Sequence, residues 1–362
     1  MASASCSLRA PISRAVSLRS ERGQGKASIL RAQPARSAQA RNALRVAASA
    51  VDATQPASGN DVVIRRRPPS GIGKHGCGPD FDFVVEGADT PINILEEIVW
   101  SKHTELEKRK EKLSLALVMK MAKAAPPVRD FLGALHEFEA RTGKPALIAE
   151  VKKASPSKGV MQPNFDPVRI GVEYEKGGAT CLSVLTDEKF FQGSYENLQL
   201  IRAAGVKCPL LCKEFIVEPY QIYLARAFGA DAILLIAAVL PNQDLKYLMK
   251  IAHSLDMTVL LEVHTYKEME RVLELDNLKL LGINNRDLGT FEVTLNVTVD
   301  LMAGPLGDKV RERGILMVGE SGIFTPADVK VVQDAGVKAL LVGESLVRES
   351  DPATAIKTLL SL

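Results

Sequence analysis

Several short apolar runs in the sequence end in side chains that can exchange protons or hold charged substrates. Glu150 lies at the end of the run 146–151, and Lys152 follows two positions later. Because side chains alternate along a strand, Glu150 and Lys152 are expected to share one side of it. Three further runs end in residues of the same kinds: Lys213 with Glu214, Glu262, and Asn284 with Arg286 just beyond it.

Lysines and acids that converge in this way favour acid–base catalysis. If Lys152, Lys213, Glu150 and Glu262 met at one site, they would shift one another's pKa values, as a catalytic centre requires. Any single run could end in a charge only because solvent begins there. Five of the eight apolar runs have such an end, however, if the run 315–319, which leads into the glutamate of GESGI, is included, and solvent exposure explains that coincidence poorly. The pattern predicts an enzyme, provided that the fold brings the strand ends together.

Eight apolar runs rich in β-branched residues recur every 21 to 36 residues, with amphipathic helical stretches in most of the gaps. They occupy 146–151, 180–185, 209–213, 232–236, 258–263, 279–284, 315–319 and 339–343. Continuous apolar strands that alternate with helices predict a parallel sheet covered on both faces. Eight such units predict an α/β fold, the closed (β/α)8 TIM barrel, whose active site lies at the C-terminal strand ends. The alternative, an open doubly wound sheet, usually has fewer strands, and no GxGxxG motif follows any run.

The residues before the first strand predict an N-terminal helical extension of two helices. Thr90 is a candidate N-cap with Pro91 at the first helical position, and the second helix runs through Phe131 to a stop at Gly143. Helices of the barrel are expected to begin at capping residues followed by proline: Asp166-Pro167, Thr325-Pro326, Asp351-Pro352 and, with a weaker cap, Glu218-Pro219. The catalytic domain is therefore expected at 90–362, including helices within 90–143.

The last two strands lead into short glycine-containing turns, GESGI at 319–323 and GESLV at 343–347. Backbone N–H groups at such turns bind phosphate, and this fold frequently has a phosphate site after these two strands. The glycines could also serve only to permit tight turns. A phosphorylated substrate is nevertheless the favoured interpretation.

Two loops near the predicted mouth of the barrel could complete the site. The loop 155–166, SPSKGVMQPNFD, is long, polar and flexible at Gly159, as a lid would be. The loop after the second strand places Phe190 and Phe191 at the mouth. There they would either cap the core or form an apolar wall for an aromatic substrate.

The composition argues against several other classes of protein. Of the 362 residues, 46% are hydrophobic and 25% charged, an ordinary globular balance. No stretch reaches the roughly 18 apolar residues of a membrane span. The five cysteines are odd in number and lack paired metal-ligand spacing, which predicts reduced thiols, no disulfide framework and no metal site.

The N-terminus has a composition of its own. Residues 1–50 hold eight Arg, one Lys and nine Ser against a single acid, Glu21. This pattern predicts an organellar transit peptide over 1–60, chloroplast or mitochondrial, with a disordered basic tail as the alternative. The Pro, Gly and clustered charge of 61–89 predict a flexible linker. Without residues 1–50 the net charge falls from +3 to −5, so no nucleic-acid-binding domain is expected.

The strand ends, taken together, resemble the indole-3-glycerol phosphate synthase family. The resemblance rests on AEVKKASPSKG, SVLTDEKFFQGSYENL, LLCKEFI, LLEVHT, GINNRDL, GESGI and LVGESLV, and covers approximately 90–362 on all strands but the fourth. The first motif, the lysine-bearing third strand and GINNRDL are specific in combination, whereas any one alone would be weak. With the leader, the resemblance indicates a plant or algal form located in the chloroplast stroma.

The resemblance implies a carboxy-lyase of tryptophan biosynthesis that needs no cofactor and no metal. Its substrate would be 1-(2-carboxyphenylamino)-1-deoxyribulose 5-phosphate, which closes to an indole ring with loss of CO₂ and water. Attack on a ketone needs a proton donor at the developing alkoxide, which a lysine can supply. Dehydration needs a carboxylate that takes up and returns a proton.

Residue by residue, the resemblance implies that Lys213 is the general acid of ring closure and that Glu262 serves the later proton transfer and dehydration. Lys152 would pair with the substrate carboxylate or act as a second acid, and which lysine donates first is left open. Glu150 would orient the lysines. The other implied contacts are Asn284 and Arg286 at the sugar and anthranilate, Phe191 and Phe215, and Ser155, Ser321, Gly322, Gly343 and Glu344 at the phosphate. We expect the Glu344 side chain to point outward, because its charge would repel phosphate.

Two rival interpretations are kept. One is another phosphosugar barrel, either an isomerase of the same pathway or an aldolase that forms a Schiff base through Lys213. The other is a barrel that only binds phosphosugars or partner enzymes, which would not need this set of acids and lysines. We expect a monomer. The charged stretch 104–112 is a candidate contact for other enzymes of the pathway, although a solvated helix face is the simpler explanation.

Overall fold

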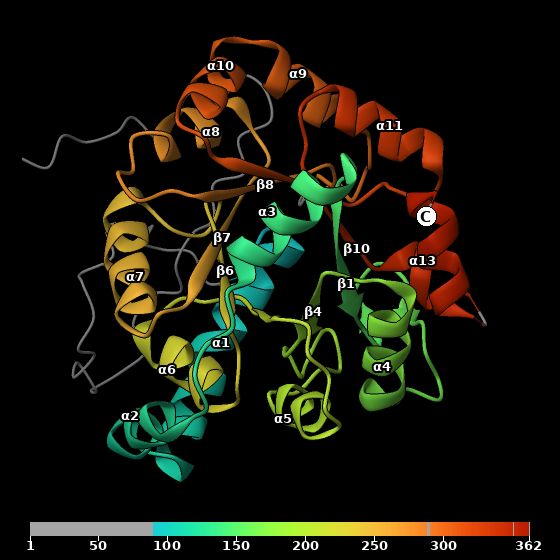
Figure 1. Ribbon diagram of the computed structural model, residues 1–362. Helices are drawn as coiled ribbons and strands as arrows, with labels where there is room; N and C mark the ends of the chain where they lie inside the picture. The colour runs from blue at the N-terminus through green and yellow to red at the C-terminus, as the bar shows by residue number, and fades with distance from the viewer. Residues whose placement is uncertain (1–89, 288–289, 350, 362) are drawn as a thin grey trace, which may run out of the picture. The chain divides into compact units, whose positions relative to one another are not determined.

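Eight parallel strands close into a barrel in the computed structural model, which describes residues 90–287, 290–349 and 351–361 (Figure 1). They are β1 (Ala146–Val151), β4 (Cys181–Leu185), β5 (Leu210–Lys213), β6 (Ala232–Ile236), β7 (Thr258–Val263), β8 (Leu280–Asn284), β9 (Leu316–Glu320) and β10 (Ala339–Val342). The barrel closes because β1 pairs with both β4 and β10. The predicted (β/α)8 barrel is confirmed, and every strand overlaps the run predicted for it. The predicted leader 1–60 and linker 61–89 lie outside the described residues.

Helices connect the strands around the outside of the barrel (Figure 1). They are α4 (Pro167–Gly177), α5 (Glu196–Ala203), α6 (Pro219–Ala227), α7 (Asn242–Ser254), α8 (Tyr266–Val272), α9 (Asn296–Ala303), α10 (Pro305–Glu312), α11 (Pro326–Asp334), α12 (Glu344–Val347) and α13 (Pro352–Leu360). The four predicted cap–proline starts, those of α4, α6, α11 and α13, are confirmed. The loop after β1 folds into a small antiparallel hairpin of β2 (Ala154–Ser155) and β3 (Gly159–Val160).

The N-terminal extension contains three helices rather than the two predicted: α1 (Ile94–Lys112), α2 (Leu115–Ala124) and α3 (Phe131–Thr142). The break between α1 and α2 occurs at Ser114, whose extended backbone and side chain cap the second helix. The expectation that Thr90 caps the first helix is also wrong. Asn93 is the N-cap, because its side chain accepts the Glu96 N–H at 2.8 Å. The predicted stop at Gly143 is confirmed, with φ of 67°.

The extension meets both ends of the barrel. The backbone carbonyl of Phe131, at the start of α3, accepts a hydrogen bond from the Cys181 thiol at the start of β4. Ile94, Leu95 and Ile98 of α1 instead line a pocket at the opposite, C-terminal end. Helix α1 is therefore part of the wall of the site. No helix in the described ranges has the length and apolar character needed to cross a membrane.

Candidate active site

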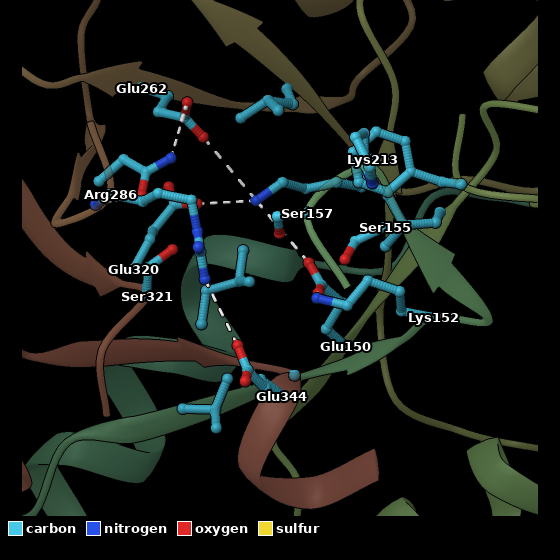
Figure 2. Close-up of a pocket in the computed structure, with 18 of the residues that line it drawn as sticks. Glu150, Lys152, Ser155, Ser157, Lys213, Glu262, Arg286, Glu320, Ser321 and Glu344 are labelled. Carbon is cyan, nitrogen blue, oxygen red and sulfur yellow. Dashed lines mark hydrogen bonds and ion pairs between the residues drawn. The ribbon is translucent and has the colours of Figure 1, made fainter. Parts of the chain in front are cut away.

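The C-terminal ends of the strands surround a pocket lined with charged side chains (Figure 2). The structure places all thirteen residues predicted for catalysis or substrate binding in its lining: Glu150, Lys152, Ser155, Phe191, Lys213, Phe215, Glu262, Asn284, Arg286, Ser321, Gly322, Gly343 and Glu344. They meet because all strands of a parallel barrel end at the same mouth, however far apart they are in sequence.

Lys213 lies at the centre of this pocket, among three carboxylates. Its Nζ is 2.8 Å from Glu320 Oε2, 3.8 Å from Glu262 Oε2 and 3.9 Å from Glu150 Oε2. These carboxylates come from β9, β7 and β1, so three strands hold the ammonium group from different sides (Figure 2). The Lys213 side chain is thereby held in one position.

Burial and the neighbouring charges shift the pKa values of Lys213 and Glu320. Burial lowers the pKa of Lys213, but the three carboxylates outweigh burial and hold that pKa above its ordinary value. Burial raises the pKa of Glu320 to about 8, because the attraction of Lys213 only partly offsets desolvation and Glu262 repels a second negative charge. Glu320, the carboxylate nearest to the Lys213 ammonium group at 2.8 Å, is therefore able to exchange a proton near neutral pH.

Glu150 joins the two lysines of the site. Its Oε1 forms an ion pair with Lys152 Nζ, while its Oε2 faces Lys213. The predicted common side of Glu150 and Lys152 on β1 is thus observed. Burial pushes the pKa of Glu150 up, but the two lysines outweigh it and lower the pKa, so this carboxylate stays ionised.

Asn284 at the end of β8 holds Glu262 in place. Its side-chain amide donates to Glu262 Oε1 at 3.3 Å, and its Oδ1 accepts the Arg286 N–H at 3.0 Å. The carbonyl of Asn284 lies 2.6 Å from the Nδ1 atom of His264. Asn284 therefore links the carboxylate of β7 to the backbone that carries Arg286.

The turn after β9 has an unusual backbone conformation. Ser321 and Gly322 both adopt left-handed backbone conformations, with φ of 63° and 78°. For a serine this conformation costs about 1–2 kcal/mol, and such strain clusters at ligand sites. Asn285 stabilises the turn, because its side chain donates to the carbonyls of Glu320 and Ser321 at 3.0 and 3.2 Å.

The expectation that the Glu344 side chain points outward is wrong. Its carboxylate lines the pocket and forms ion pairs with Arg286 at 3.4 Å and with Arg348 (Figure 2). Lys158 of the loop after β1 lies 3.9 Å from the same carboxylate. Three cations satisfy the charge of Glu344, which removes the physical reason for turning it towards solvent.

Aromatic and aliphatic side chains form another part of the pocket lining. The rings of Phe191 and Phe215 lie 5.8 Å apart, in the tilted arrangement that aromatic pairs favour. Phe190, which was predicted at the same mouth, is instead covered by Lys189 at 4.5 Å and is absent from the pocket lining. Of the two phenylalanines of this loop, Phe191 is the one placed to meet a substrate.

Glu320 is the central charged residue that the sequence analysis missed as a site residue. It was interpreted only as part of the glycine turn after β9. The signal was nevertheless present, because Glu320 is the last residue of β9, as Lys213 is the last residue of β5. The neighbouring glycines drew the interpretation towards phosphate binding.

Gly282 on β8 leaves the space that Glu320 occupies, so Gly282→Ala is expected to displace it. An added Cβ would lie 2.2 Å from Glu320 Oε1. The carboxyl must then leave its present position beside Lys213, and kcat/KM is expected to fall about 10²-fold, the cost of a 1 Å misplacement. Steady-state kinetics at a temperature where circular dichroism shows full folding would measure this loss.

Gly319→Ala is a matched control on the neighbouring strand. A Cβ there would meet Val337 at 3.5 Å as its nearest neighbour, an ordinary contact outside the pocket. Its kcat/KM is expected to stay within about twofold of the wild-type value, as for a surface or well-accommodated change. Equal activity of the two variants would show that the position of Glu320 does not matter.

The fold and this site define a (β/α)8-barrel enzyme with a lysine-centred acid–base site. In the described ranges no group of three or more His, Cys, Asp or Glu residues is arranged to hold a metal ion.

Comparisons with known proteins identify the family. The family model of indole-3-glycerol phosphate synthase matches residues 95–359, and the chain therefore belongs to this family. The chain is 56% identical over 295 residues to "Indole-3-glycerol phosphate synthase, chloroplastic" of Arabidopsis thaliana, a match that covers 81% of this chain and 73% of that protein. It is 53% identical to the synthase of Crocosphaera subtropica, covering 82% and 99%, and 57% identical to that of Microcystis aeruginosa, covering 77% and 93%. The predicted family, and with it a carboxy-lyase of tryptophan biosynthesis, is confirmed.

Proposed function

We propose that the pocket converts 1-(2-carboxyphenylamino)-1-deoxyribulose 5-phosphate to indole-3-glycerol phosphate with Lys213 as the general acid of ring closure. The observation that carries this assignment is the position of Lys213, whose ammonium group is held by carboxylates of three strands in the centre of the pocket. The turn at Ser321 and Gly322, which lines the pocket, would receive the phosphate. The pair Phe191 and Phe215 would receive the carboxyphenyl ring.

Ring closure needs one proton. The ring carbon that bears the carboxylate attacks the ribulose carbonyl carbon, and the carbonyl electrons move to oxygen. That oxygen takes a proton from Lys213 and becomes a hydroxyl. A lysine whose pKa lies above its usual range is still a suitable donor, because the developing alkoxide is more basic than the amine.

Loss of CO₂ and water completes the indole. The bond to the carboxylate breaks, and its electrons return to the ring, which becomes aromatic again as CO₂ departs. The new hydroxyl then leaves as water with a proton from a lysine, while Glu262 takes the proton from the neighbouring carbon. Lys152 has two candidate roles, as the partner of the substrate carboxylate or as the proton donor of this last step. Both are compatible with its ion pair to Glu150.

Indole formation by the purified protein tests this function directly. Protein beginning near residue 65 is mixed with the substrate, and indole fluorescence is followed together with CO₂ release. Equal amounts of CO₂ and indole product are expected. A well-folded protein that forms no indole would contradict the proposal and favour a phosphosugar isomerase.

The plastid assignment is a second part of the proposal, in which residues 1–60 direct the chain to the chloroplast stroma. It is supported by the Arg- and Ser-rich, acid-poor leader and by the chloroplastic relative from Arabidopsis thaliana. Residues 1–60 fused to a fluorescent protein are expected to enter chloroplasts of plant cells, whereas a fusion that begins at residue 61 should stay outside. Import of neither fusion, or of both, would contradict it. The monomeric state and contacts with other pathway enzymes stay predictions.

A further inference from the structure

A second ionic cluster is centred on Lys102 of helix α1 and reaches the pocket at Glu214, which is one of the lining residues. The Lys102 side chain is fully buried, and its Nζ is 2.7 Å from Asp187 Oδ2 and 3.0 Å from Glu214 Oε1. Asp187 and Glu214 are also fully buried. Glu105, at 2.9 Å, lies at the partly exposed rim. We call Lys102, Asp187 and Glu214 the Lys102 cluster.

Glu214 connects this cluster to the catalytic strand. It directly follows Lys213, and its Oε1 also accepts the Phe215 N–H at 2.9 Å. Its Oε2 accepts the Thr186 hydroxyl at 2.9 Å, and the Thr186 N–H donates to the Lys213 carbonyl at 3.2 Å. The backbone on both sides of Glu214 is therefore tied to the cluster.

Asp187 connects the cluster to the aromatic wall. Its Oδ1 accepts the N–H groups of Phe190 at 2.7 Å and Phe191 at 3.1 Å. The ring of Phe191 packs against the ring of Phe215, and the backbone N–H of Phe215 donates to Glu214. One ammonium group thus links the turn after β4 with the end of β5.

The energetics of the cluster favour a geometric role over a purely stabilising one. Burial raises the pKa of Glu214, the attraction of Lys102 offsets this only in part, and Asp187 raises it further. Apolar residues of similar volume often stabilise a fold as well as a buried ion cluster does. Removal of the single cation, in contrast, leaves two carboxylates buried close together with no positive charge between them. A cluster of this kind fixes the relative positions of helix α1, the turn after β4 and the end of β5, because a shift of any of them would separate the buried charges.

We propose that Lys102 is a positioning residue for the active site. Through Glu214 it holds Lys213 and Phe215 in position, and through Asp187 it holds Phe191 in position. Helix α1 therefore contributes to the geometry of the active site. The inference rests on the proposed role of Lys213 as the general acid. It assigns to the N-terminal extension a function in catalysis in addition to covering the barrel.

Lys110 of the same helix offers a matched control. Its Nζ pairs with Glu218 at 2.6 Å, next to the start of α6, so it also ties α1 to the barrel. The Lys110 side chain is 41% exposed, and it lies outside the pocket lining. Lys110→Met therefore removes a lysine–glutamate bridge between α1 and the barrel without touching the Lys102 cluster.

The test compares Lys102→Met with Lys110→Met in the full chain. Methionine keeps most of the length of lysine and removes its charge. For Lys102→Met, kcat/KM is expected to fall about 10²-fold, the effect of a displacement of roughly 1 Å at the reacting groups. The loss should appear in kcat as well as in KM, because both Lys213 and the aromatic wall move. Lys110→Met should stay within about twofold of wild type, as exposed ion pairs contribute little.

Two further measurements separate positioning from folding. Trp100, the single tryptophan of the chain, lies on α1 two residues from Lys102 and reports in the absence of substrate whether α1 is still docked. Its emission is expected to be unchanged in Lys102→Met. The double variant Lys102→Met with Glu214→Gln removes one of the uncompensated charges, and it should recover about tenfold of the lost kcat/KM, since the two residues are directly coupled.

The proposal is overturned if Lys102→Met and Lys110→Met have the same kcat and KM. It is also overturned if the activity lost equals the unfolded fraction seen by circular dichroism. A crystal structure of the variant gives an answer that does not depend on turnover. Lys213 and Phe191 in unchanged positions would contradict the proposal, whereas their displacement would support it even if the wild-type protein failed to form indole and the proposed function fell.

Discussion

Lys213→Met is expected to lower kcat by about 10³-fold, within the range attributed to a positioned general acid. Methionine fills most of the space of the lysine stem but cannot protonate the oxygen that forms during ring closure. The variant should still fold, because Glu320 already has a pKa raised to about 8 and can hold its proton once the cation is absent. Stopped-flow measurement of indole fluorescence, with circular dichroism of the same sample, would quantify the loss.

Lys330→Met is the control for this variant. Lys330 pairs with Asp334 on the exposed face of α11, with its side chain 73% exposed, and its loss should leave kcat unchanged. Indole formation that survives in Lys213→Met would transfer the role of acid to Lys152, the other lysine that contacts Glu150. Covalent trapping of wild-type protein by substrate and borohydride would instead support a Schiff-base aldolase.

The site residues at the strand ends could be predicted because the barrel topology alone brings them together. In a closed parallel barrel every strand ends at the same mouth, so a residue needs only the right position within its own strand to reach the site. Glu150, Lys213, Glu262 and Asn284 satisfy this condition, and each could be found without knowledge of any neighbour. Glu320 satisfies it as well. It was missed because the glycine turn beside it supplied a competing explanation.

Contacts that depend on packing between distant elements were harder to predict. The side chain of Glu344 was expected to point outward because its charge would repel phosphate. Its cationic partners, among them Lys158 and Arg286, come from different segments, and the sequence does not show that they meet. Lys102 was passed over because the charges of α1 resembled a solvated helix face. One signal was available there: Leu95, Val99, Lys102 and Leu106 have the spacing of a single helical stripe. A lysine on an otherwise apolar stripe predicts a buried partner.

The extension shows how local signals compete. Thr90 followed by proline satisfies the rule for a helix start, yet Asn93 is the N-cap. Its side chain accepts the Glu96 N–H at 2.8 Å, and the Glu96 carboxylate accepts the Ile92 N–H at 2.7 Å. These two hydrogen bonds determine where the helix begins, in spite of the proline that follows Thr90. The same kind of competition occurs at Ser114, where a cap divides what was predicted as one continuous segment.

Glu262→Gln is expected to separate loss of CO₂ from formation of the indole. If Glu262 removes the proton in the dehydration step, ring closure and decarboxylation continue in the variant, while dehydration slows by about 10³-fold. Glutamine has nearly the same shape and can still accept the hydrogen bond that Asn284 donates to Glu262 at 3.3 Å. The site should therefore keep its geometry. In a single turnover, CO₂ should appear rapidly and indole fluorescence should follow with a long delay.

Glu270→Gln, an exposed change on the helix that follows β7, provides the control and should show no delay. The relative timing of the two products decides where Glu262 acts. If CO₂ and indole slow down together, Glu262 is needed before decarboxylation, and its main task is to orient Lys213, 3.8 Å away. If neither slows, the proton is removed elsewhere. Glu320 is then the nearest alternative base, because it shares Lys213 with Glu262 and its pKa of about 8 allows it to exchange a proton near neutral pH.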